Sequence, residues 1–289
     1  MKIRRRKRYL LCAAAALLVL GDCSGTAVCA AQTLPPVTLS SDASMPETLL
    51  DVSGDDILPM LDPGLSDEEL RAYYGDSVFI GDSIMLGFRN YSAKQETYVH
   101  DIQFLAAGSY GVNNALKPVK GDNVHPKYNG QKYQLWDAIP LIGSKRAFIM
   151  FGMNDIAPLG LEGARDKYKE LIDKILETSP DLEIHIISMT YTLKGKGKKV
   201  LNNTNIDAYN LLLQEMAEEN GWKYIDLCTV TSDGEGNLAA DCCSDGFVHL
   251  TKTAYTLWEA ELINYANAVA SEEEEAAEGT QIPADALPQ

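Results

Sequence analysis

The sequence predicts an α/β protein in which helices cover both faces of a central, mostly parallel, five-stranded sheet, giving a three-layer α/β/α sandwich. Two observations predict this fold class. Short apolar segments alternate along the chain with segments of helical periodicity, as they do where crossover helices join parallel strands. In addition, 289 residues, 46% of them hydrophobic, are enough to bury a large core. Right-handed crossovers make a doubly wound sheet the expected topology.

Five segments have the character of strands. The first, Val78-Phe79-Ile80, is fully apolar and runs directly into Gly81-Asp82-Ser83. This junction predicts a strand-to-helix turn that carries a serine. It is also the pattern of an ordinary helix N-cap, for which Asp and Ser are preferred. The other strands are predicted at residues 101–107, 147–151, 183–190 and 224–227.

Helical segments lie between and around these strands. Ser66-Asp67-Glu68-Glu69 has the capping-box pattern and begins a short helix that ends near Tyr74. Gly221 follows another helix in the position of a C-cap. Residues 120–133 predict a long polar surface loop, and residues 194–199 predict a basic, glycine-bearing loop. A helix follows Ser83, and the others are predicted at residues 112–119, 161–178, 204–220 and 253–270.

Both ends of the chain predict segments outside the folded domain. Residues 1–31 have the basic start, the short apolar stretch and the small residues of a signal peptide. We therefore expect a secreted or cell-surface protein, with an uncleaved N-terminal anchor as the alternative. Residues 32–65 are rich in Pro, Ser and Asp and predict a linker or N-terminal arm. Residues 66–270 form the predicted domain, and residues 271–289 predict an acidic, disordered tail.

Composition narrows the classes of partner and cofactor. A formal net charge of −16 argues against nucleic acid as a partner, because nucleic acid needs a basic surface. Cys228, Cys242 and Cys243 follow the signal peptide in a spacing that matches no zinc pattern. We expect either a disulfide from Cys228 to one of the other two, or three free thiols. The sequence contains no metal-ligand cluster, phosphate loop or dinucleotide fingerprint, so we expect no metal and no cofactor.

Polar, glycine-bearing clusters follow three of the predicted strands. They are Gly81-Asp82-Ser83, Gly108-Ser109-Tyr110-Gly111 and Gly152-Met153-Asn154-Asp155. The carboxyl ends of parallel strands meet at one edge of the sheet, where open α/β folds place their sites. Backbone N–H groups of the first two clusters and the amide of Asn154 are therefore candidate donors to a developing oxyanion.

A serine nucleophile also needs a base, and His249 is the best placed of the four histidines. It lies in a turn-like segment just before the last predicted helix, four residues after Asp245. Asp245 is positioned to accept the ring N–H of His249 and fix its tautomer, as the third member of a catalytic triad does. A surface histidine next to an ordinary Asp-Gly turn is the alternative interpretation. His185 is expected to be a packed strand residue.

Together, these blocks resemble those of the SGNH, or GDSL, hydrolase superfamily. The resemblance rests on Gly81–Gly87, on Gly108–Gly111, on Gly152–Asp155 and on Asp245 with His249, in that order over residues 77–250. It implies a flavodoxin-like fold and ester hydrolysis without a metal. The implied roles are nucleophile for Ser83, base for His249, orienting acid for Asp245, oxyanion donors for Ser83, Gly111 (or alternatively Gly108) and Asn154, and support for Asp82, Gly152 and Asp155.

One departure from the superfamily concerns the last block. The usual spacing places two residues between the acid and the base, whereas three separate Asp245 from His249 here. The role of Asp245 therefore depends on how the backbone between the two residues is arranged.

The resemblance and the signal peptide together favour a secreted serine esterase. We expect it to remove acyl groups, most simply acetyl groups, from a carbohydrate or a cell-wall polymer. A lipid acylhydrolase or an O-acyltransferase would use the same residues. A carbohydrate-binding domain without catalysis, on the same fold, is a further alternative. The expected partner is a small ester or an acetylated glycan, and association with the cell surface is also expected; the sequence does not indicate an oligomeric state.

Overall fold

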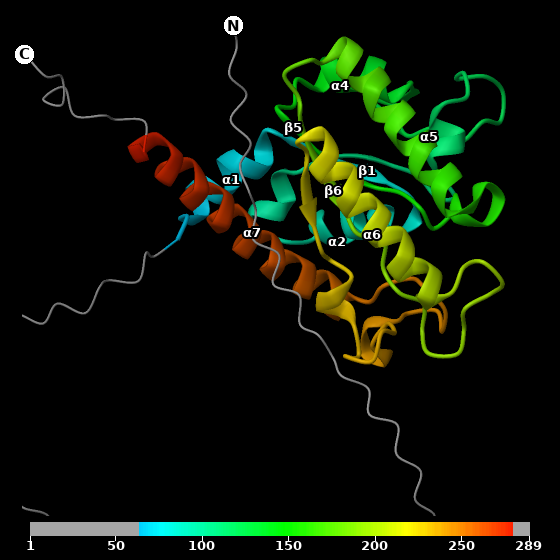
Figure 1. Cartoon of the computed structure of the whole chain (residues 1–289). Helices are drawn as coiled ribbons and strands as arrows, with labels where there is room; N and C mark the ends of the chain where they lie inside the picture. The colour runs from blue at the N-terminus through cyan, green and yellow to red at the C-terminus, as the bar shows by residue number, and fades with distance from the viewer. Residues whose placement is uncertain (1–63, 280–289) are drawn as a thin grey trace, which may run out of the picture. The chain divides into compact units, whose positions relative to one another are not determined.

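The computed structural model describes residues 64–279, and these contain a sheet of five parallel strands in the order β2-β1-β5-β6-β7 (Figure 1). The predicted fold class is confirmed, and every pairing in this sheet is parallel. The strands are β1 (Ser77–Gly81), β2 (Gln103–Ala106), β5 (Arg146–Met150), β6 (Glu183–Ile187) and β7 (Lys223–Ile225).

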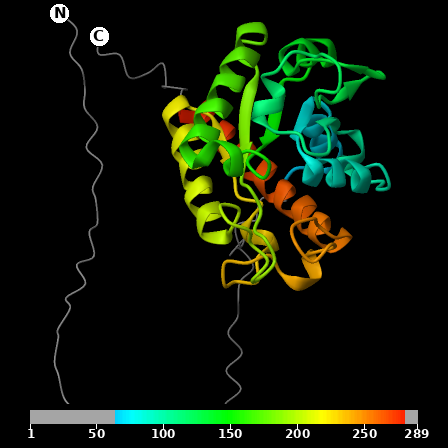
Figure 2. The ribbon, with the colours of Figure 1, turned by 90° about the vertical axis from the view of Figure 1, so that its right-hand side faces the viewer.

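Helices cover the sheet on both faces. The chain leaves β1 for β2 on one side and returns through β5 to β6 and β7 on the other, so the helices divide between the two faces. Figures 1 and 2 show α1, α2 and α7 on one face and α4, α5 and α6 on the other. The helices are α1 (Asp67–Gly75), α2 (Ser83–Ser92), α3 (Val112–Ala115), α4 (Leu135–Ile142), α5 (Ile156–Thr178), α6 (Asn203–Asn220) and α7 (Lys252–Gly279).

An aromatic cluster holds α1 and α7 against the middle of the sheet. Phe79 of β1 stacks on Phe148 of β5 with their ring centroids 4.5 Å apart, and both side chains are fully buried. Tyr74 of α1 packs against both rings and donates its hydroxyl to the backbone oxygen of Leu262 in α7, 2.6 Å away. Such buried aromatic pairs add stability beyond the area that they bury, so this face of the sheet is firmly fixed.

Most predicted elements are present, with differences at their ends. The capping box of α1 is formed, and Gly221 ends α6 with a left-handed backbone conformation, φ +71°. The strand predicted at residues 101–107 is shorter, because Asp101 ends a 3-10 turn (Tyr98–Asp101) and β2 covers only Gln103–Ala106. Helix α5 contains a non-helical residue, Gly160, immediately before the predicted helix start at residue 161.

Three features differ from the sequence prediction. Residues 120–133, predicted as a loop, contain a short antiparallel pair, β3 (Lys127–Tyr128) and β4 (Gln131–Lys132). Helix α4 was not predicted, because it is only eight residues long, mostly apolar and contains Pro140. The tail prediction was wrong for residues 271–279, because α7 continues to Gly279; a run of Glu has good intrinsic helix propensity and extends a helix that packing has already begun.

The predicted signal peptide, most of the predicted linker and the last ten residues of the chain lie outside the described residues. Within residues 64–279, no helix combines the length and the apolar character needed to cross a bilayer.

Candidate active site

The three polar clusters meet where the sheet changes its winding direction. Strand β1 pairs with β2 on one side and with β5 on the other, and the polar clusters follow the carboxyl ends of these three strands. In doubly wound sheets the crevice beyond this switch point is the usual ligand site. The topology therefore brings the loops of Ser83, Gly111 and Asn154 to the same edge.

Ser83 is both a helix residue and an accessible hydroxyl. Asp82 is the N-cap of α2, and its Oδ1 accepts the N–H of Ile84 at 2.8 Å. Ser83 is the first residue of the helix and is partly exposed. The N-cap interpretation of this junction is thus correct for Asp82, and it leaves the side chain of Ser83 free to act.

A chain of two hydrogen bonds connects Ser83 to His249 and Asp245. Nε2 of His249 lies 3.0 Å from Oγ of Ser83, and Nδ1 of His249 lies 2.6 Å from Oδ2 of Asp245. A carboxylate only accepts, so Nδ1–H donates to Asp245 and the neutral ring presents a lone pair at Nε2 to the Ser83 hydroxyl. This is the arrangement that activates a serine for attack.

A compact turn lets Asp245 reach His249 although three residues separate them. Oδ1 of Asp245 accepts the N–H of Phe247 at 2.8 Å and that of Val248 at 2.9 Å. Gly246 adopts a left-handed conformation, φ +72°, which a residue with a side chain rarely adopts. The turn folds the extra residue out of the way, and Oδ2 of Asp245 is left facing the imidazole of His249.

Asp245 is held in its ionised form. Partial burial alone would raise its pKa, but the hydrogen bonds from His249 and from three backbone N–H groups lower the pKa well below the usual range. The side chains of Asp245 and His249 remain 36% and 46% exposed. Asp245 and His249 therefore lie at an open edge of the protein.

Gly111, not Gly108, lies within the site. Gly108 is exposed, and a Cβ added to it would meet no atom within 4 Å. Gly111, in contrast, is buried against Asp155. A Cβ on Gly111 would lie 2.4 Å from Oδ1 of Asp155, so the close approach requires glycine. Among the described residues, the N–H of Gly111 has no hydrogen-bond acceptor, and that of Ser83 is at a helix start, where no intrahelical acceptor exists.

The amide of Asn154 lies next to this loop. Its Nδ2 donates to the backbone oxygen of Tyr110 at 3.0 Å and approaches Oδ2 of Asp82 at 3.4 Å. The second contact is long for a hydrogen bond, so the N–H that points to Asp82 is the one that can more easily donate to an oxyanion instead. Asp82 is fully buried, and burial raises its pKa to about 7, with the nearby Asp155 adding to the shift.

Asp155 and Gly152 support the site from beneath. Oδ1 of Asp155 accepts the N–H of Asn113 at 3.3 Å and so ties the Gly111 loop to the end of β5. Burial raises the pKa of Asp155 above its usual value. Gly152 packs so closely on Tyr209 that a Cβ would lie 2.5 Å from that ring. Both residues therefore fix the backbone that carries Asn154.

The remaining histidines and the cysteines lie outside this arrangement. His185 is buried in β6, stacks on Phe148 and hydrogen-bonds Tyr265 through Nδ1 at 2.7 Å, as expected for a packed strand residue. Cys228, Cys242 and Cys243 are free thiols, which decides between the two alternatives left open by the sequence. Within residues 64–279, no group of three or more His, Cys, Asp or Glu side chains is arranged to hold a metal ion.

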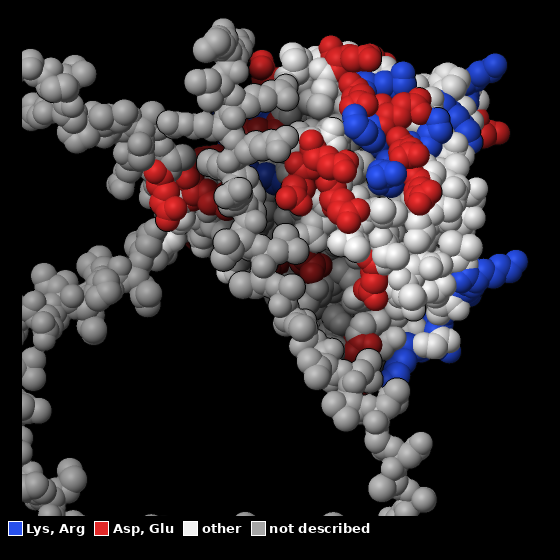
Figure 3. Space-filling view, in the orientation of Figure 1, with Lys and Arg blue, Asp and Glu red and all other residues white. Residues whose placement is uncertain are grey.

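Two further segments adjoin the loop of Asp245 and His249, of which Tyr255 was not expected from the sequence and the basic loop was. Tyr255 of α7 donates its hydroxyl to the backbone oxygen of Ile84, which joins the helix after His249 to the helix of Ser83. The basic loop of residues 194–199 lies against the other side: Leu193 N–H donates to the oxygen of Phe247, and Nζ of Lys198 lies 4.3 Å from the centre of its ring. Figure 3 shows Lys and Arg side chains projecting at the lower right, where this loop lies in Figure 1.

Comparison with solved structures shows the same fold in bacterial proteins. A candidate platelet activating factor from Streptococcus pneumonia is 18% identical with a TM-score of 0.50, and the match covers 69% of this chain and 92% of that one. A GDSL-like lipase from Bacteroides thetaiotaomicron is 14% identical with a TM-score of 0.50, and the match covers 67% of this chain and 88% of that one. A candidate acylhydrolase from Bacteroides fragilis is 15% identical with the same score, covering 72% and 91%. At these identities the likeness concerns the fold alone.

Comparison of sequences identifies the family. None of the curated proteins matches the chain. The sequence profile of the GDSL-like lipase/acylhydrolase family matches residues 79–257, which include Ser83, Asn154, Asp245 and His249. The match spans more than half of the chain and all the blocks that carry the resemblance. The chain therefore belongs to the GDSL-like lipase/acylhydrolase family of ester-hydrolysing enzymes.

Proposed function

We propose that this chain is a secreted serine esterase that removes acetyl groups from a carbohydrate or cell-wall polymer. The observation that carries the proposal is the hydrogen-bonded sequence Ser83–His249–Asp245. Secretion is supported by the signal-peptide pattern of residues 1–31. A polymer as substrate is supported by the exposure of Asp245 and His249 at an open edge.

The proposed reaction has two steps. Oγ of Ser83 attacks the ester carbonyl while Nε2 of His249 takes the hydroxyl proton; the tetrahedral oxyanion is stabilised by the N–H groups of Ser83 and Gly111 and by the amide of Asn154. His249 then gives its proton to the leaving alcohol, and an acyl-enzyme remains on Ser83. In the second step His249 deprotonates a water molecule as it attacks the acyl group, and then gives this proton to Oγ of Ser83 as acetic acid is released.

The proposal is tested with a fluorophosphonate probe and with p-nitrophenyl acetate. We expect the wild-type protein to be labelled and to hydrolyse the ester. In Ser83→Ala the labelling should vanish and kcat should fall by about 10⁴-fold or more. Ser271→Ala, a change at an exposed serine of α7, is the matched control and should behave as wild type. Turnover that persists in Ser83→Ala would contradict the proposed nucleophile.

A further inference from the structure

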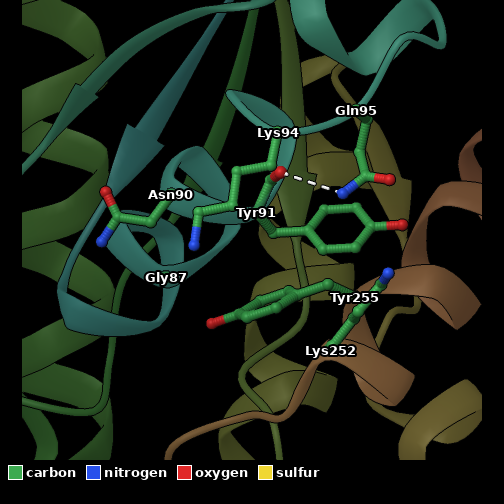
Figure 4. Close-up of a pocket in the computed structure, with 7 residues that line it drawn as sticks. All are labelled: Gly87, Asn90, Tyr91, Lys94, Gln95, Lys252 and Tyr255. Atoms are coloured by element: carbon green, nitrogen blue, oxygen red, sulfur yellow. Dashed lines mark hydrogen bonds between the residues drawn. The ribbon is translucent and has the colours of Figure 1, made fainter.

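A pocket lies between α2, which carries Ser83, and the start of α7, which follows His249. Its volume is about 300 Å³, and Figure 4 shows the side chains that line it. Five of them belong to α2 and α7, and two lie in the turn just after α2. The lining residues are Gly87, Asn90, Tyr91, Lys94, Gln95, Lys252 and Tyr255. None of them belongs to the blocks that carry the proposed chemistry, apart from Gly87 at the end of the first block.

The pocket begins one helical turn away from the nucleophile. Gly87 follows Ser83 by four residues, which in an α-helix is the same face at a rise of about 6 Å. On the other helix, Lys252 follows His249 by three residues and is the first residue of α7. The hydrogen bond between Ser83 and His249 joins the same two helices at their beginnings. A chain-like substrate bound at Ser83 can therefore extend into this pocket.

The charge of the pocket is opposite to that of the protein. Lys94 and Lys252 are both exposed, and within residues 64–279 neither makes an ion pair, although the whole chain carries a net charge of −16. Lys94 follows the carboxyl end of α2, where the helix dipole favours a cation. Lys252 begins α7, where the dipole disfavours one, and no acidic residue in the first turn offsets it. An unpaired cation kept at that end suits a bound anion.

The rest of the lining combines an apolar floor with an amide donor. Tyr91 and Tyr255 lie with their ring centroids 5.8 Å apart and are only 8% and 5% exposed, so they form the floor of the pocket (Figure 4). The hydroxyl of Tyr91 donates to the carboxylate of Glu259 at 2.6 Å, so this hydroxyl is already engaged. Asn90 uses its side-chain oxygen to accept from Arg89 and keeps its NH₂ group available. Such an amide donor can bind the hydroxyl groups of a sugar.

A further cation lies on the other side of the catalytic loop. Lys198 rests on the ring of Phe247, two residues before His249, and among the described residues it forms no ion pair. Unpaired lysines therefore flank the His249 segment on both sides. A neutral substrate would gain nothing from this arrangement, whereas an anionic polymer would be attracted along its length.

We propose that the pocket between α2 and α7 binds a carboxylate-bearing sugar residue next to the acetylated residue held at Ser83. The enzyme would then act on an anionic glycan, with Lys94 and Lys252 facing the carboxylate. This inference rests on the proposed esterase function.

The first test compares two substrates of equal length, an acetylated oligogalacturonide and a neutral acetylated cello-oligosaccharide. At low salt, the ratio of kcat/KM for the anionic substrate to that for the neutral one should exceed 1, and salt should reduce it. Lys94→Gln and Lys252→Gln should each lower this ratio by about three- to fivefold, as expected for exposed ion pairs. Lys127→Gln, at an exposed lysine of β3, is the control and should leave the ratio unchanged.

The second test measures binding without turnover. Ser83→Ala should bind trigalacturonate in calorimetry, and Ser83→Ala with Lys252→Gln should bind it several-fold more weakly. An unchanged substrate ratio in both lysine variants, or no binding of trigalacturonate, would overturn the inference. A rise in kcat/KM as the acyl chain is lengthened from acetyl to hexanoyl would also overturn it, because the pocket would then serve a lipid chain. Failure of the proposed esterase function is a different result, namely no turnover of any ester.

Discussion

At the scale of single residues, Asp245 has two separate functions, one for each of its oxygens. Oδ1 accepts backbone N–H groups and shapes the turn, while Oδ2 accepts the imidazole N–H of His249. A carboxylate can do both because it has several acceptor sites. Replacing Asp245 by Asn separates the two functions, because the Asn side chain keeps one acceptor oxygen and has an NH₂ donor in place of the other.

We predict that Asp245→Asn keeps the turn but loses catalysis. The amide oxygen can still accept the backbone N–H groups, while its NH₂ group faces Nδ1 of His249 and favours the wrong tautomer. On this basis kcat for p-nitrophenyl acetate should fall by about 10³- to 10⁴-fold, with little change in thermal stability. Fluorophosphonate labelling should be slow but present. Wild-type kcat in this variant would mean that another group orients His249.

At the scale of elements, the packing of α7 on α2 decides whether Ser83 and His249 meet. Tyr255 crosses α2 at Gly87, where a Cβ would lie 2.0 Å from its hydroxyl oxygen. That hydroxyl donates to the backbone oxygen of Ile84 at 2.8 Å, one residue after Ser83. The two helices are therefore fixed close to the point where Ser83 and His249 form their hydrogen bond.

Gly87→Ala tests this contact against a matched glycine in another helix. At Gly163 of α5, a Cβ would meet only the Cβ of Leu159 at an ordinary 3.6 Å, so Gly163→Ala should stabilise the protein by about 0.5–1 kcal/mol through helix propensity. Gly87→Ala should instead destabilise it by about 1–3 kcal/mol, because Tyr255 must move. Thermal unfolding of both variants measures the difference, and equal stabilisation by both would refute the close packing. Gly87→Ala should also lower kcat.

At the scale of the whole molecule, the buried carboxylate of Asp82 links stability to pH. Its pKa is raised from 3.8 to about 7 in the folded protein, so between these values the folded state holds a proton that the unfolded state has lost. Stability contributed through this group is therefore greatest at low pH and falls as the pH rises from about 4 to about 7. Above pH 7 the cost of burying the charge is constant.

We predict that Asp82→Asn removes this part of the pH dependence. Asn is also a good N-cap, so α2 should still begin at the same place. Relative to wild type, the free energy of unfolding of Asp82→Asn should increase by about 3 kcal/mol between pH 4 and pH 7. Denaturant unfolding at several pH values measures it, with Asp173→Asn on the exposed surface of α5 as the control. Parallel curves for Asp82→Asn and wild type would contradict the prediction.

The sequence was most informative where a buried strand ends in a polar cluster. The apolar runs of β1 and β5 and the residues Ser83 and Asn154 could be recognised because strand period and punctuation are local signals. Gly111 was preferred over Gly108 from the resemblance alone, and its physical reason could not be seen, because it depends on Asp155, more than forty residues away in the chain. The pocket of Tyr255 and Lys252 against α2 was equally hidden, since tertiary packing alone brings those helices together. Helix α4 was missed because it is short and lacks a polar face.

Asp245 and His249 share one short loop, and this has a consequence for how the candidate site can come apart. Ser244 N–H donates to the oxygen of His249 at 2.8 Å and closes the loop upon itself, so Asp245 and His249 move together as one rigid piece. Ser83 belongs to α2, 166 positions away, and its hydroxyl reaches His249 through one 3.0 Å hydrogen bond. Any separation of α7 from α2 would therefore disengage the nucleophile while leaving the acid–base couple whole. Activity should then be lost on heating before the imidazole loses its carboxylate partner.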